Sequence, residues 1–597
     1  MSEAAPGRDA GRPASSRSES RADADAPAPL AAARAWLAQD PDPTTRAELD
    51  ELVGRAEAGD AAASVDLADR FAGRLAFGTA GLRGELGAGS NRMNRVLVAQ
   101  AAAGLAAYLG EHTAPDQTPS VVIGYDGRRN SDVFARDSAE LFAGAGLRAI
   151  LLPRMLPTPV LAFAVRHLGA DAGVMVTASH NPPNDNGYKV YLGGADAGSQ
   201  IVPPADAGIA AHIERVAATA SVLDLPRSEA YEIASDDVVD AYVAATAAVG
   251  PAPEGAQGLR WVYTAMHGVG WETVARVVRA AGYPEPVVVS AQIEPDGRFP
   301  TVAFPNPEEP GAMDLAFETA RDADAELVIA NDPDADRLAV ALPDPAAAGG
   351  WRRLTGNQVG LLLGWRAARQ AAARQAGQAG APAESGAQAG ASASLACSLV
   401  SSPGLEAVAS HYGLDFHATL TGFKWISRAP GIVFGFEEAL GYLVNPETVR
   451  DKDGISAAVA MLQLVSEARG EGRTLVDLLD EFDRTFGFFA SDQISVRVDD
   501  VAAIGRIMSA LRAQHPSAVG DATVTGVDDL LRDAGDLPPG DVLRLWLDGG
   551  SRLIVRPSGT EPKLKLYLDV RGESREDAAA RLAALSAGAR ALLASLG

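Results

Sequence analysis

The segment TASHNPPNDNGYK, residues 177–189, brings three chemically active side chains together directly after the apolar run 172–176. They are the hydroxyl of Ser179, the imidazole of His180 and the ammonium of Lys189, and we expect all three on one loop. A serine at the end of a buried strand can act as a nucleophile or as a carrier of a phosphoryl group. The other motifs of the chain bear on this choice.

Ser179 and His180 do not form the pattern of a hydrolase. Adjacent residues of an extended chain point to opposite faces, so we expect His180 to be poorly placed to deprotonate Ser179. The serine also lacks the G-x-S-x-G surroundings of a nucleophile elbow. The sequence therefore disfavours an esterase and favours phosphoryl transfer, provided that a metal site and cationic groups lie elsewhere in the chain.

A second loop, NDPDADR, carries three carboxylates at alternate positions after an apolar strand. Asp332, Asp334 and Asp336 would repel one another unless they share a cation, and an all-oxygen ligand set favours Mg²⁺. An EF-hand is excluded, because Arg337 and Pro343 stand where that calcium loop needs glycine and glutamate. The alternative is a solvated acidic turn, which three carboxylates after a buried strand disfavour.

The motif RPSGTEPK near the C-terminus offers the groups that a phosphate dianion requires. A guanidinium, two hydroxyls and an unhindered backbone can surround a tetrahedral anion, and a nearby lysine adds charge. The residues concerned are Arg556, Ser558, Gly559, Thr560 and either Lys563 or Lys565. This motif supplies the basic pocket that an anionic substrate needs in an acidic protein, although a plain Ser-Gly hairpin turn remains the alternative.

Two further loops have weaker signals. FGTAGLRGELG contains one cation, Arg83, among glycines that permit close backbone approach, but it matches neither the dinucleotide-binding nor the Walker pattern. GFEEALGY pairs Glu437 with Glu438, whose carboxylates could bind sugar hydroxyls. The alternative for this pair is the start of a helix, where acidic residues are favoured by the helix dipole.

Alternating apolar runs and helical patterns predict three consecutive α/β units before an antiparallel α+β tail. In parallel sheets, ligands collect at the carboxyl ends of the strands, where Ser179 and the NDPDADR loop lie. We predict a disordered tail at 1–28, mixed α/β domains at 29–225, 226–345 and 346–486, and an α+β domain at 487–597. Within the third domain, residues 366–396 are predicted to extend a helix and then form a low-complexity insertion.

Composition limits the class of protein. A chain of 597 residues exceeds one hydrophobic core, and a formal net charge of -25 argues against a nucleic-acid partner. The chain has neither an uncharged apolar run of about 18 residues nor an apolar signal core, so we expect no membrane partner. The single cysteine, Cys397, excludes an intrachain disulfide and favours a cytoplasmic location.

Four motifs in this order, TASHNPP, DPDADR, FEEALG and RPSGTEPK, resemble those of the α-D-phosphohexomutase superfamily. The resemblance extends from about residue 40 to the C-terminus, and GTAGLRG and TGFKWI are most similar to its phosphoglucomutase 2/phosphopentomutase-like branch. It implies a heart-shaped enzyme whose four domains surround a central cleft. It also implies a Mg²⁺-dependent phosphosugar mutase that works through a phosphoserine and a bisphosphorylated sugar.

The resemblance assigns roles to individual residues. Ser179 corresponds to the phosphoryl carrier, and an oxygen of phosphoserine with Asp332, Asp334 and Asp336 corresponds to the Mg²⁺ ligands. Residues that match positions around the transferred phosphoryl group are Arg83, His180 and Lys189. Residues that match substrate contacts are Arg337, Thr421, Gly422, Lys424, Glu437 and Lys452. Residues that match the clamp for the second phosphate are Arg556, Ser558, Gly559, Thr560 and Lys565.

Two departures from the family pattern concern the sugar. Ala439 stands where glucomutases commonly have serine, and Phe423 and Tyr442 replace histidines of the bacterial mannomutase/glucomutase branch. We expect interconversion of glucose 1-phosphate and glucose 6-phosphate, with pentose and mannose phosphates as alternatives. A sugar phosphatase and a non-catalytic phosphosugar-binding protein are the other classes. We expect a phosphosugar substrate, a sugar bisphosphate activator, and a monomer or weak homodimer.

Overall fold

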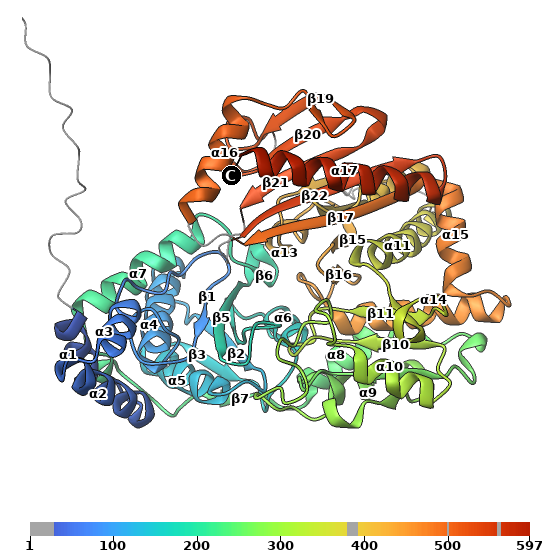
Figure 1. The fold of residues 1–597 in the computed structure, drawn as a ribbon. Helices are drawn as coiled ribbons and strands as arrows, with labels where there is room; N and C mark the ends of the chain where they lie inside the picture. The colour runs from blue at the N-terminus through green and yellow to red at the C-terminus, as the bar shows by residue number, and fades with distance from the viewer. Residues whose placement is uncertain (1–28, 379–391, 498–500, 536, 558–562, 597) are drawn as a thin grey trace, which may run out of the picture.

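The computed structural model describes residues 29–378, 392–497, 501–535, 537–557 and 563–596. The predicted tail at 1–28 lies outside these residues, as does the central part of the predicted insertion. Helix α11 (Gly356–Gln378) confirms the predicted helical extension. Within the described residues the strands form four sheets in chain order, three mixed and the last antiparallel (Figure 1). This arrangement confirms the predicted fold class.

The first sheet has a parallel centre with antiparallel strands at one side. Its order is β1-β5-β4-β2-β3-β7, with β6 paired to β5. The strands are β1 (Leu82–Glu85), β2 (Ser120–Tyr125), β3 (Arg148–Leu151), β4 (Ala172–Val176), β5 (Asp185–Leu192), β6 (Ser199–Gln200) and β7 (Glu232–Ile233). The helices are α1 (Pro29–Leu37), α2 (Pro43–Glu57), α3 (Ala61–Arg70), α4 (Arg95–His112), α5 (Ser131–Gly144), α6 (Thr158–His167) and α7 (Ala205–Thr219).

The second sheet confirms the three parallel strands predicted for this unit. Its order is β12-β11-β10-β8-β9, in which β10, β8 and β9 run parallel. The strands are β8 (Trp261–Thr264), β9 (Val287–Val288), β10 (Leu327–Ala330), β11 (Ala339–Pro343) and β12 (Trp351–Arg353), and the helices are α8 (Asp237–Ala247), α9 (Gly270–Ala281) and α10 (Asp314–Asp322). The aspartate loop joins β10 to the antiparallel strand β11.

The third sheet has the order β14-β13-β15-β16. Its strands are β13 (Ser394–Ser398), β14 (Asp415–Thr419), β15 (Ile432–Glu437) and β16 (Gly441–Leu443), and its helices are α11, α12 (Gly404–Tyr412), α13 (Phe423–Ile426), α14 (Gly454–Gly470) and α15 (Leu475–Phe486). β15 and β16 are antiparallel, so the FEEALG motif forms the turn of a hairpin. The alternative of a helix start at Glu437 is therefore wrong.

The fourth sheet is the predicted antiparallel meander with its first strand placed beside its last. The order is β17-β22-β21-β20-β19-β18. Its strands are β17 (Phe488–Arg497), β18 (Ala518–Val519), β19 (Ala522–Asp529), β20 (Leu543–Leu547), β21 (Arg552–Pro557) and β22 (Lys563–Gly572), and its helices are α16 (Val501–Ala513) and α17 (Arg575–Leu596). The sequence did not predict β19, whose register shifts between Val524 and Gly526 and interrupts its alternating pattern.

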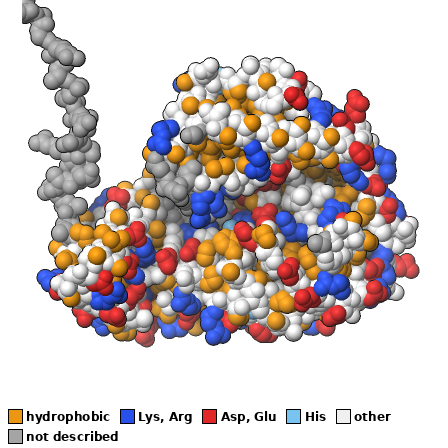
Figure 2. All heavy atoms as spheres, viewed as in Figure 1, with side chains coloured by type: hydrophobic (Ala, Val, Ile, Leu, Met, Phe, Trp, Pro, Cys, Tyr) orange, Lys and Arg blue, Asp and Glu red, His pale blue; other side chains and the backbone are white. Residues whose placement is uncertain are grey.

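The fourth sheet has a hydrophobic core of its own. One core runs without interruption from a face of the first sheet, at Val122, through Trp261 of the second to Phe434 of the third. The fourth sheet and its helices enclose a separate core around Leu545 and Leu566. The surface is hollowed between this C-terminal unit and the rest of the molecule (Figure 2). The phosphate-binding motif thus belongs to a separately packed unit.

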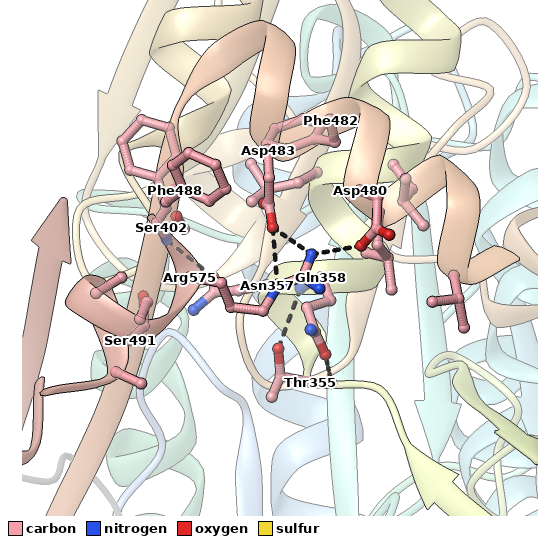
Figure 3. Close-up of a pocket in the computed structure, with 18 of the residues that line it drawn as sticks. Thr355, Asn357, Gln358, Ser402, Asp480, Phe482, Asp483, Phe488, Ser491 and Arg575 are labelled. Atoms are coloured by element: carbon pink, nitrogen blue, oxygen red, sulfur yellow. Dashed lines mark hydrogen bonds and ion pairs between the residues drawn. The ribbon is translucent and has the colours of Figure 1, made fainter. Parts of the chain in front are cut away.

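A cavity of about 400 Å³ lies where α15, β17 and α17 meet the start of α11 (Figure 3). Arg575 Nη2 forms ion pairs across it with Asp480 Oδ1, at 2.7 Å, and Asp483 Oδ2, at 2.5 Å. The rings of Phe482 and Phe488 also line it. It marks the seam between the third and fourth units and is separate from the loop that carries Ser179.

Helix α17 is the one helix among the described residues whose length and apolar composition would allow it to cross a membrane. Its inward side lies on the fourth sheet, since Ala578, Leu585 and Ala589 belong to the same core as Leu566 and Leu568. This packing is that of a helix covering one face of a sheet in a globular domain.

Candidate active site

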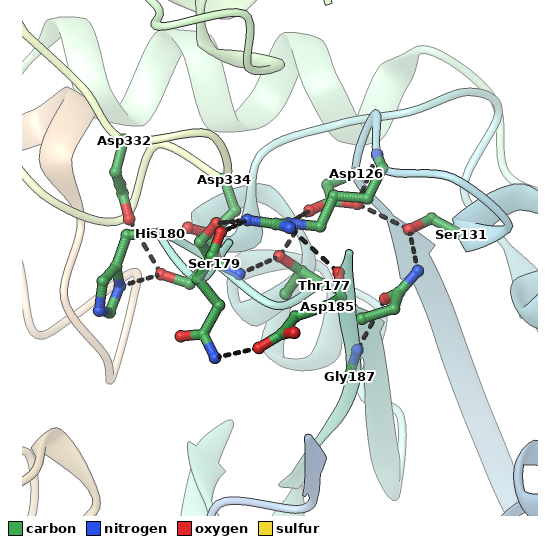
Figure 4. A network of polar contacts seen from close by, with 12 residues as sticks. Asp126, Ser131, Thr177, Ser179, His180, Asp185, Gly187, Asp332 and Asp334 are labelled. Atoms are coloured by element: carbon green, nitrogen blue, oxygen red, sulfur yellow. Dashed lines mark hydrogen bonds and ion pairs between the residues drawn. The ribbon is translucent and has the colours of Figure 1, made fainter. Parts of the chain in front are cut away.

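Ser179 lies in the turn between β4 and β5, at the carboxyl end of the parallel strands (Figure 4). Its backbone is left-handed, with φ of 53°, which costs a residue with a side chain about 1–3 kcal/mol. Two hydrogen bonds oppose this strain. Ser179 N donates to Thr177 Oγ1 at 2.8 Å, and Thr177 Oγ1 donates to Asp126 Oδ2 at 2.6 Å. The end of β2 therefore holds the reactive serine in place.

The left-handed backbone corrects the prediction for His180. The prediction assumed extended chain, but positive φ at Ser179 turns the imidazole towards its neighbour, and Ser179 Oγ lies 3.1 Å from His180 Nδ1. Burial, together with the positive charges of Arg337 and Arg83, lowers the pKa of His180 well below its usual value. The imidazole is therefore neutral at neutral pH and can accept a proton beside the serine oxygen.

Lys189 lies on strand β5 instead of on the Ser179 loop. The prediction of a single loop from 177 to 189 was wrong, because DNGYKVYL pairs with β4 and places Lys189 opposite Met175. Its Nζ donates to Asp334 Oδ2 at 2.8 Å and to Asp336 Oδ2 at 2.9 Å. Burial would lower the pKa of Lys189, but these carboxylates outweigh it and raise the pKa, so the ammonium stays charged.

Asp332, Asp334 and Asp336 converge after strand β10, as predicted. All three are fully buried, and one oxygen of each lies within 4.8 Å of the others. Asp332 Oδ2 accepts from Ser179 Oγ at 2.9 Å, and Thr158 Oγ1 donates to Asp334 Oδ2 at 2.7 Å. The aspartate loop and the serine loop, from different sheets, therefore meet at one point.

Each carboxylate of the aspartate cluster has a protein cation nearby. Burial and the neighbouring carboxylates raise the pKa of Asp332 well above its usual value. Burial also acts against ionisation of Asp336, but the ammonium groups of Lys189 and Lys452 outweigh it and hold the pKa of Asp336 below its usual value. The ammonium groups of Lys189 and Lys452 and the guanidinium of Arg337 thus face three carboxylates in a buried site.

The residues present fit a Mg²⁺ ion. Asp334 Oδ1 and Asp336 Oδ1 are buried, and neither accepts a hydrogen bond from the part of the protein that the structure describes. A buried carboxylate oxygen without a partner is costly unless a cation binds it. Mg²⁺ prefers carboxylate oxygens and is held by few protein ligands together with phosphate oxygens. The aspartate cluster beside Ser179 has this chemistry.

Two arginines lie with the lysines around the cluster. Arg337 follows the aspartates, with its Nε 3.9 Å from Asp332 Oδ2, and Lys452 Nζ pairs with Asp336. Arg83, on β1, donates from Nη1 to Asn181 Oδ1 of the serine loop at 3.2 Å. The structure therefore brings Arg83, Arg337 and Lys452 to the same site, where their charges suit a phosphoryl group in transfer.

The predicted sugar-binding residues lie on the third sheet, beside the aspartate loop. Leu338 N donates to Leu440 O at 3.0 Å and so joins that loop to the FEEALG hairpin. Glu437 Oε2 accepts from Gly422 N at 3.1 Å, which fixes the turn that contains Thr421. Lys424, at the start of α13, contacts Thr79 Oγ1 of the glycine-rich loop. These contacts place the predicted sugar contacts at one edge of the Ser179 site.

Two residues of the predicted phosphate clamp lie opposite each other on the fourth sheet. Arg556 of β21 is the cross-strand partner of Lys565 of β22, so their side chains share a face. The charge of Arg556 acts on Lys424 and Glu437, which places it near the predicted sugar contacts. The other predicted clamp residues, Ser558, Gly559 and Thr560, lie outside the described residues.

Four segments of the chain match models of known protein domains. Models of the phosphoglucomutase/phosphomannomutase family match the α/β/α domains I, II and III at residues 74–220, 240–345 and 355–485, and the C-terminal domain at 494–585. The chain belongs to this family. It is therefore a phosphosugar mutase, an isomerase-type phosphotransferase, of a family that depends on Mg²⁺.

Relatives of this phosphosugar mutase are named for different sugars. A probable phosphomannomutase of Haemophilus influenzae is 54% identical over 502 residues, covering 84% of this chain and 98% of its own. The human phosphopentomutase is 33% identical and covers 90% of each chain, and a Staphylococcus epidermidis phosphoglucomutase is 34% identical, covering 83% and 90%. A solved putative phosphomannomutase from Thermus thermophilus, at TM-score 0.64 and 24% identity, covers 87% and 99% and shares the fold.

The mutase site includes residues that the motifs did not reveal. Asp126 and Arg128 follow strand β2 and support the serine loop, and Thr158 bonds Asp334 from the start of α6. The ring of Phe304 packs edge-on against His180, with 6.3 Å between ring centres. The Asp126 to Arg128 segment carried a usable signal, because charged residues directly after a buried parallel strand lie at the ligand-binding edge of the sheet.

Proposed function

We propose that this phosphosugar mutase interconverts glucose 1-phosphate and glucose 6-phosphate through a phosphoserine at Ser179 and a bisphosphorylated glucose. One observation carries the proposal. The Ser179 hydroxyl lies within hydrogen-bond distance of Asp332 and His180, while Arg556 and Lys565 on another sheet offer a second place for phosphate. A substrate with a phosphate at either end of a hexose fits two such places.

The first half of the proposed reaction moves a phosphoryl group from the enzyme to the sugar. The bond between phosphorus and Ser179 Oγ breaks as O6 of glucose 1-phosphate binds phosphorus. O6 gives up its proton, and Ser179 Oγ takes up a proton as it leaves; His180, whose Nδ1 lies 3.1 Å from Oγ, is placed to take part in the proton exchange at the serine oxygen. Arg83 and Lys189 stabilise the negative charge of the transferred group, and Arg556 holds the other phosphate. Mg²⁺, when bound by the aspartates, adds further charge stabilisation.

The second half returns a phosphoryl group to the enzyme. The bisphosphate turns, so that its C1 phosphate faces Ser179 and its C6 phosphate faces Arg556. The bond between phosphorus and O1 breaks, Ser179 Oγ gives up its proton and is phosphorylated again, and O1 takes up a proton. No phosphate is gained or lost over the cycle. A phosphatase would use the same serine but would need water as the acceptor and no second phosphate site.

Mannose phosphate is the second candidate substrate, favoured by the name of the Haemophilus influenzae relative. Glucose and mannose differ only at C2, so a site that holds the phosphate and the other hydroxyls discriminates weakly between them. Measuring kcat/KM for the 1-phosphates of glucose, mannose, glucosamine, ribose and deoxyribose tests the choice. We expect glucose 1-phosphate to have the highest value and mannose 1-phosphate the next. A higher value for ribose or deoxyribose phosphate would contradict the hexose assignment.

Replacing Arg556 with alanine should raise KM for glucose 1-phosphate by roughly 10- to 100-fold. A hydrogen bond to a charged group is worth about 1.5–3 kcal/mol, and the loss weakens binding of the second phosphate. Steady-state kinetics check this, with Arg544→Ala as the matched control. Arg544 is also an arginine of the fourth sheet, but it pairs with Asp528 and lies over Trp546. A KM for Arg556→Ala equal to that of the wild type would exclude the clamp assignment.

Several accompanying proposals concern partners and location. We propose that a sugar bisphosphate primes the enzyme by phosphorylating Ser179, and that the substrate is a free phosphosugar. The formal net charge of -25 disfavours nucleic acid, and the single cysteine favours the cytoplasm. We propose a monomer or weak homodimer with no membrane partner. Light scattering over a range of protein concentrations, with and without lipid vesicles, tests the oligomeric state and the absence of membrane binding.

A further inference from the structure

The loop that carries Ser179 surrounds the side chain of Arg128. Arg128 follows strand β2, and its side chain is 1% exposed. Nη1 donates to Pro182 O at 2.8 Å and to Asp185 O at 3.0 Å. Nη2 donates to Ser179 O at 2.7 Å and to Asn181 O at 2.5 Å. One guanidinium therefore binds four carbonyl groups within residues 179–185.

Three of these carbonyls belong to the loop between β4 and β5, and the fourth belongs to Asp185, the first residue of β5. A buried carbonyl needs a hydrogen-bond donor, and a guanidinium presents its donors in a rigid planar fork. Residues 179–185 can satisfy that fork only if their backbone wraps around it. The left-handed backbone at Ser179 is part of this wrapped conformation, and it directs Ser179 Oγ towards Asp332.

Two further contacts fix the guanidinium itself. Asp126 Oδ2 lies 3.6 Å from Arg128 Nε and also accepts from Thr177 Oγ1, so one carboxylate connects the arginine to the start of the serine turn. The ring of Phe299, from the second unit of the chain, covers the guanidinium at 4.9 Å. Arg128 thus contacts the serine loop on one side and the unit that carries the aspartate cluster on the other.

We propose that Arg128 is a positioning residue for phosphoryl transfer: it holds the backbone of residues 179–185 so that Ser179 Oγ faces the metal-binding aspartates. This inference rests on the proposed function of Ser179 and adds a residue that touches neither the sugar nor the phosphoryl group. A positioning role requires the fork of donors as well as the positive charge. Lysine keeps the charge and loses the fork, so Arg128→Lys separates the two contributions.

The test combines kinetics with hydrogen exchange of the serine loop. In Arg128→Lys we expect kcat to fall by roughly 100-fold, the effect of misplacing a reacting group by about 1 Å, while KM changes by less than about threefold. Amide exchange in residues 177–185 should become faster. In Arg128→Ala, added guanidinium ion should restore part of kcat, and methylammonium at the same concentration should not.

Arg148→Ala is the matched control, because this arginine of the same unit is exposed and its side chain pairs with Glu232, away from the serine loop. It should leave kcat and loop exchange unchanged. Wild-type kcat or unchanged loop exchange in folded Arg128→Lys would overturn the proposal. If Arg128→Ala does not fold, the lysine variant alone decides. Loop exchange is measured without substrate, so it tests the role of Arg128 even if the wild type proves not to act on glucose phosphates.

Discussion

Ser179→Ala should lower mutase turnover by at least about 10⁴-fold, since the variant lacks the oxygen that carries the phosphoryl group between substrates. The reason lies in the geometry: Ser179 Oγ is the one group placed between Asp332 Oδ2, at 2.9 Å, and His180 Nδ1, at 3.1 Å, within the described residues. A coupled assay for glucose 6-phosphate measures the loss. Binding of glucose 1-phosphate, measured by calorimetry, should remain within a few fold of the wild type.

Ser138→Ala is the matched control for this prediction. Ser138 is also a buried serine of the first unit, but its Oγ donates to Phe134 O at 2.7 Å on helix α5 and lies outside the site. Its variant should keep turnover close to that of the wild type. Substantial turnover by Ser179→Ala would contradict the phosphoserine assignment.

Asp332→Asn should abolish most of the stabilisation by Mg²⁺ while leaving the metal-free protein at least as stable as the wild type. Burial and the neighbouring aspartates raise the pKa of Asp332. Above that raised pKa, ionised Asp332 costs folding free energy, and this cost disappears as the pH falls and the group is protonated. Asparagine is neutral, can accept from Arg337 N as Asp332 does, and removes the cost at neutral pH.

Although Asp332→Asn should not destabilise the metal-free protein, it should lower the activity. Loss of one carboxylate from the metal site should lower kcat by roughly 10²- to 10³-fold, the scale on which single electrostatic groups act in catalysis. In the wild type, Mg²⁺ at about 100 times its Kd should stabilise the fold by about 2.7 kcal/mol, and chelation should remove both this stabilisation and activity. Asp332→Asn should show little of this stabilisation.

Thermal unfolding with and without Mg²⁺ checks the metal assignment independently of activity. Asp344→Asn is the control, because Asp344 follows strand β11 and accepts from Arg352 and Ala346 away from the site. This control should keep the Mg²⁺-dependent rise in Tm. An equal rise in Asp332→Asn would show that the aspartate cluster does not hold the metal.

Local patterns in the sequence were sufficient to predict the order of the units and the convergence of the aspartates. Buried apolar runs followed by polar loops define parallel strands, and the carboxyl ends of such strands gather at one edge. The prediction of Asp332, Asp334 and Asp336 as a cluster followed from this rule, and the structure confirms it. The structure also confirms the helical extension into α11 and the antiparallel C-terminal meander, which local composition and turn residues predicted.

The orientation of single side chains was not predictable from such patterns. The contact between the His180 imidazole and Ser179 Oγ depends on the positive φ of Ser179. This backbone conformation occurs together with the four hydrogen bonds from Arg128 to residues 179–185. The position of Lys189 depends on whether residues 185–192 pair with β4, which is a tertiary interaction. Both features require contacts between segments that are distant in the sequence, so no local rule contains them.

The measurement that tests the central claim most directly follows a labelled phosphate through one cycle. Enzyme phosphorylated at Ser179 with unlabelled phosphate is mixed with glucose 1-phosphate that carries ³²P, and the enzyme, the sugar phosphates and free phosphate are then separated. The account predicts that the label appears on Ser179 and that glucose 6-phosphate forms without matching release of free phosphate. Label confined to free phosphate, or product formed while Ser179 stays unlabelled, would contradict it.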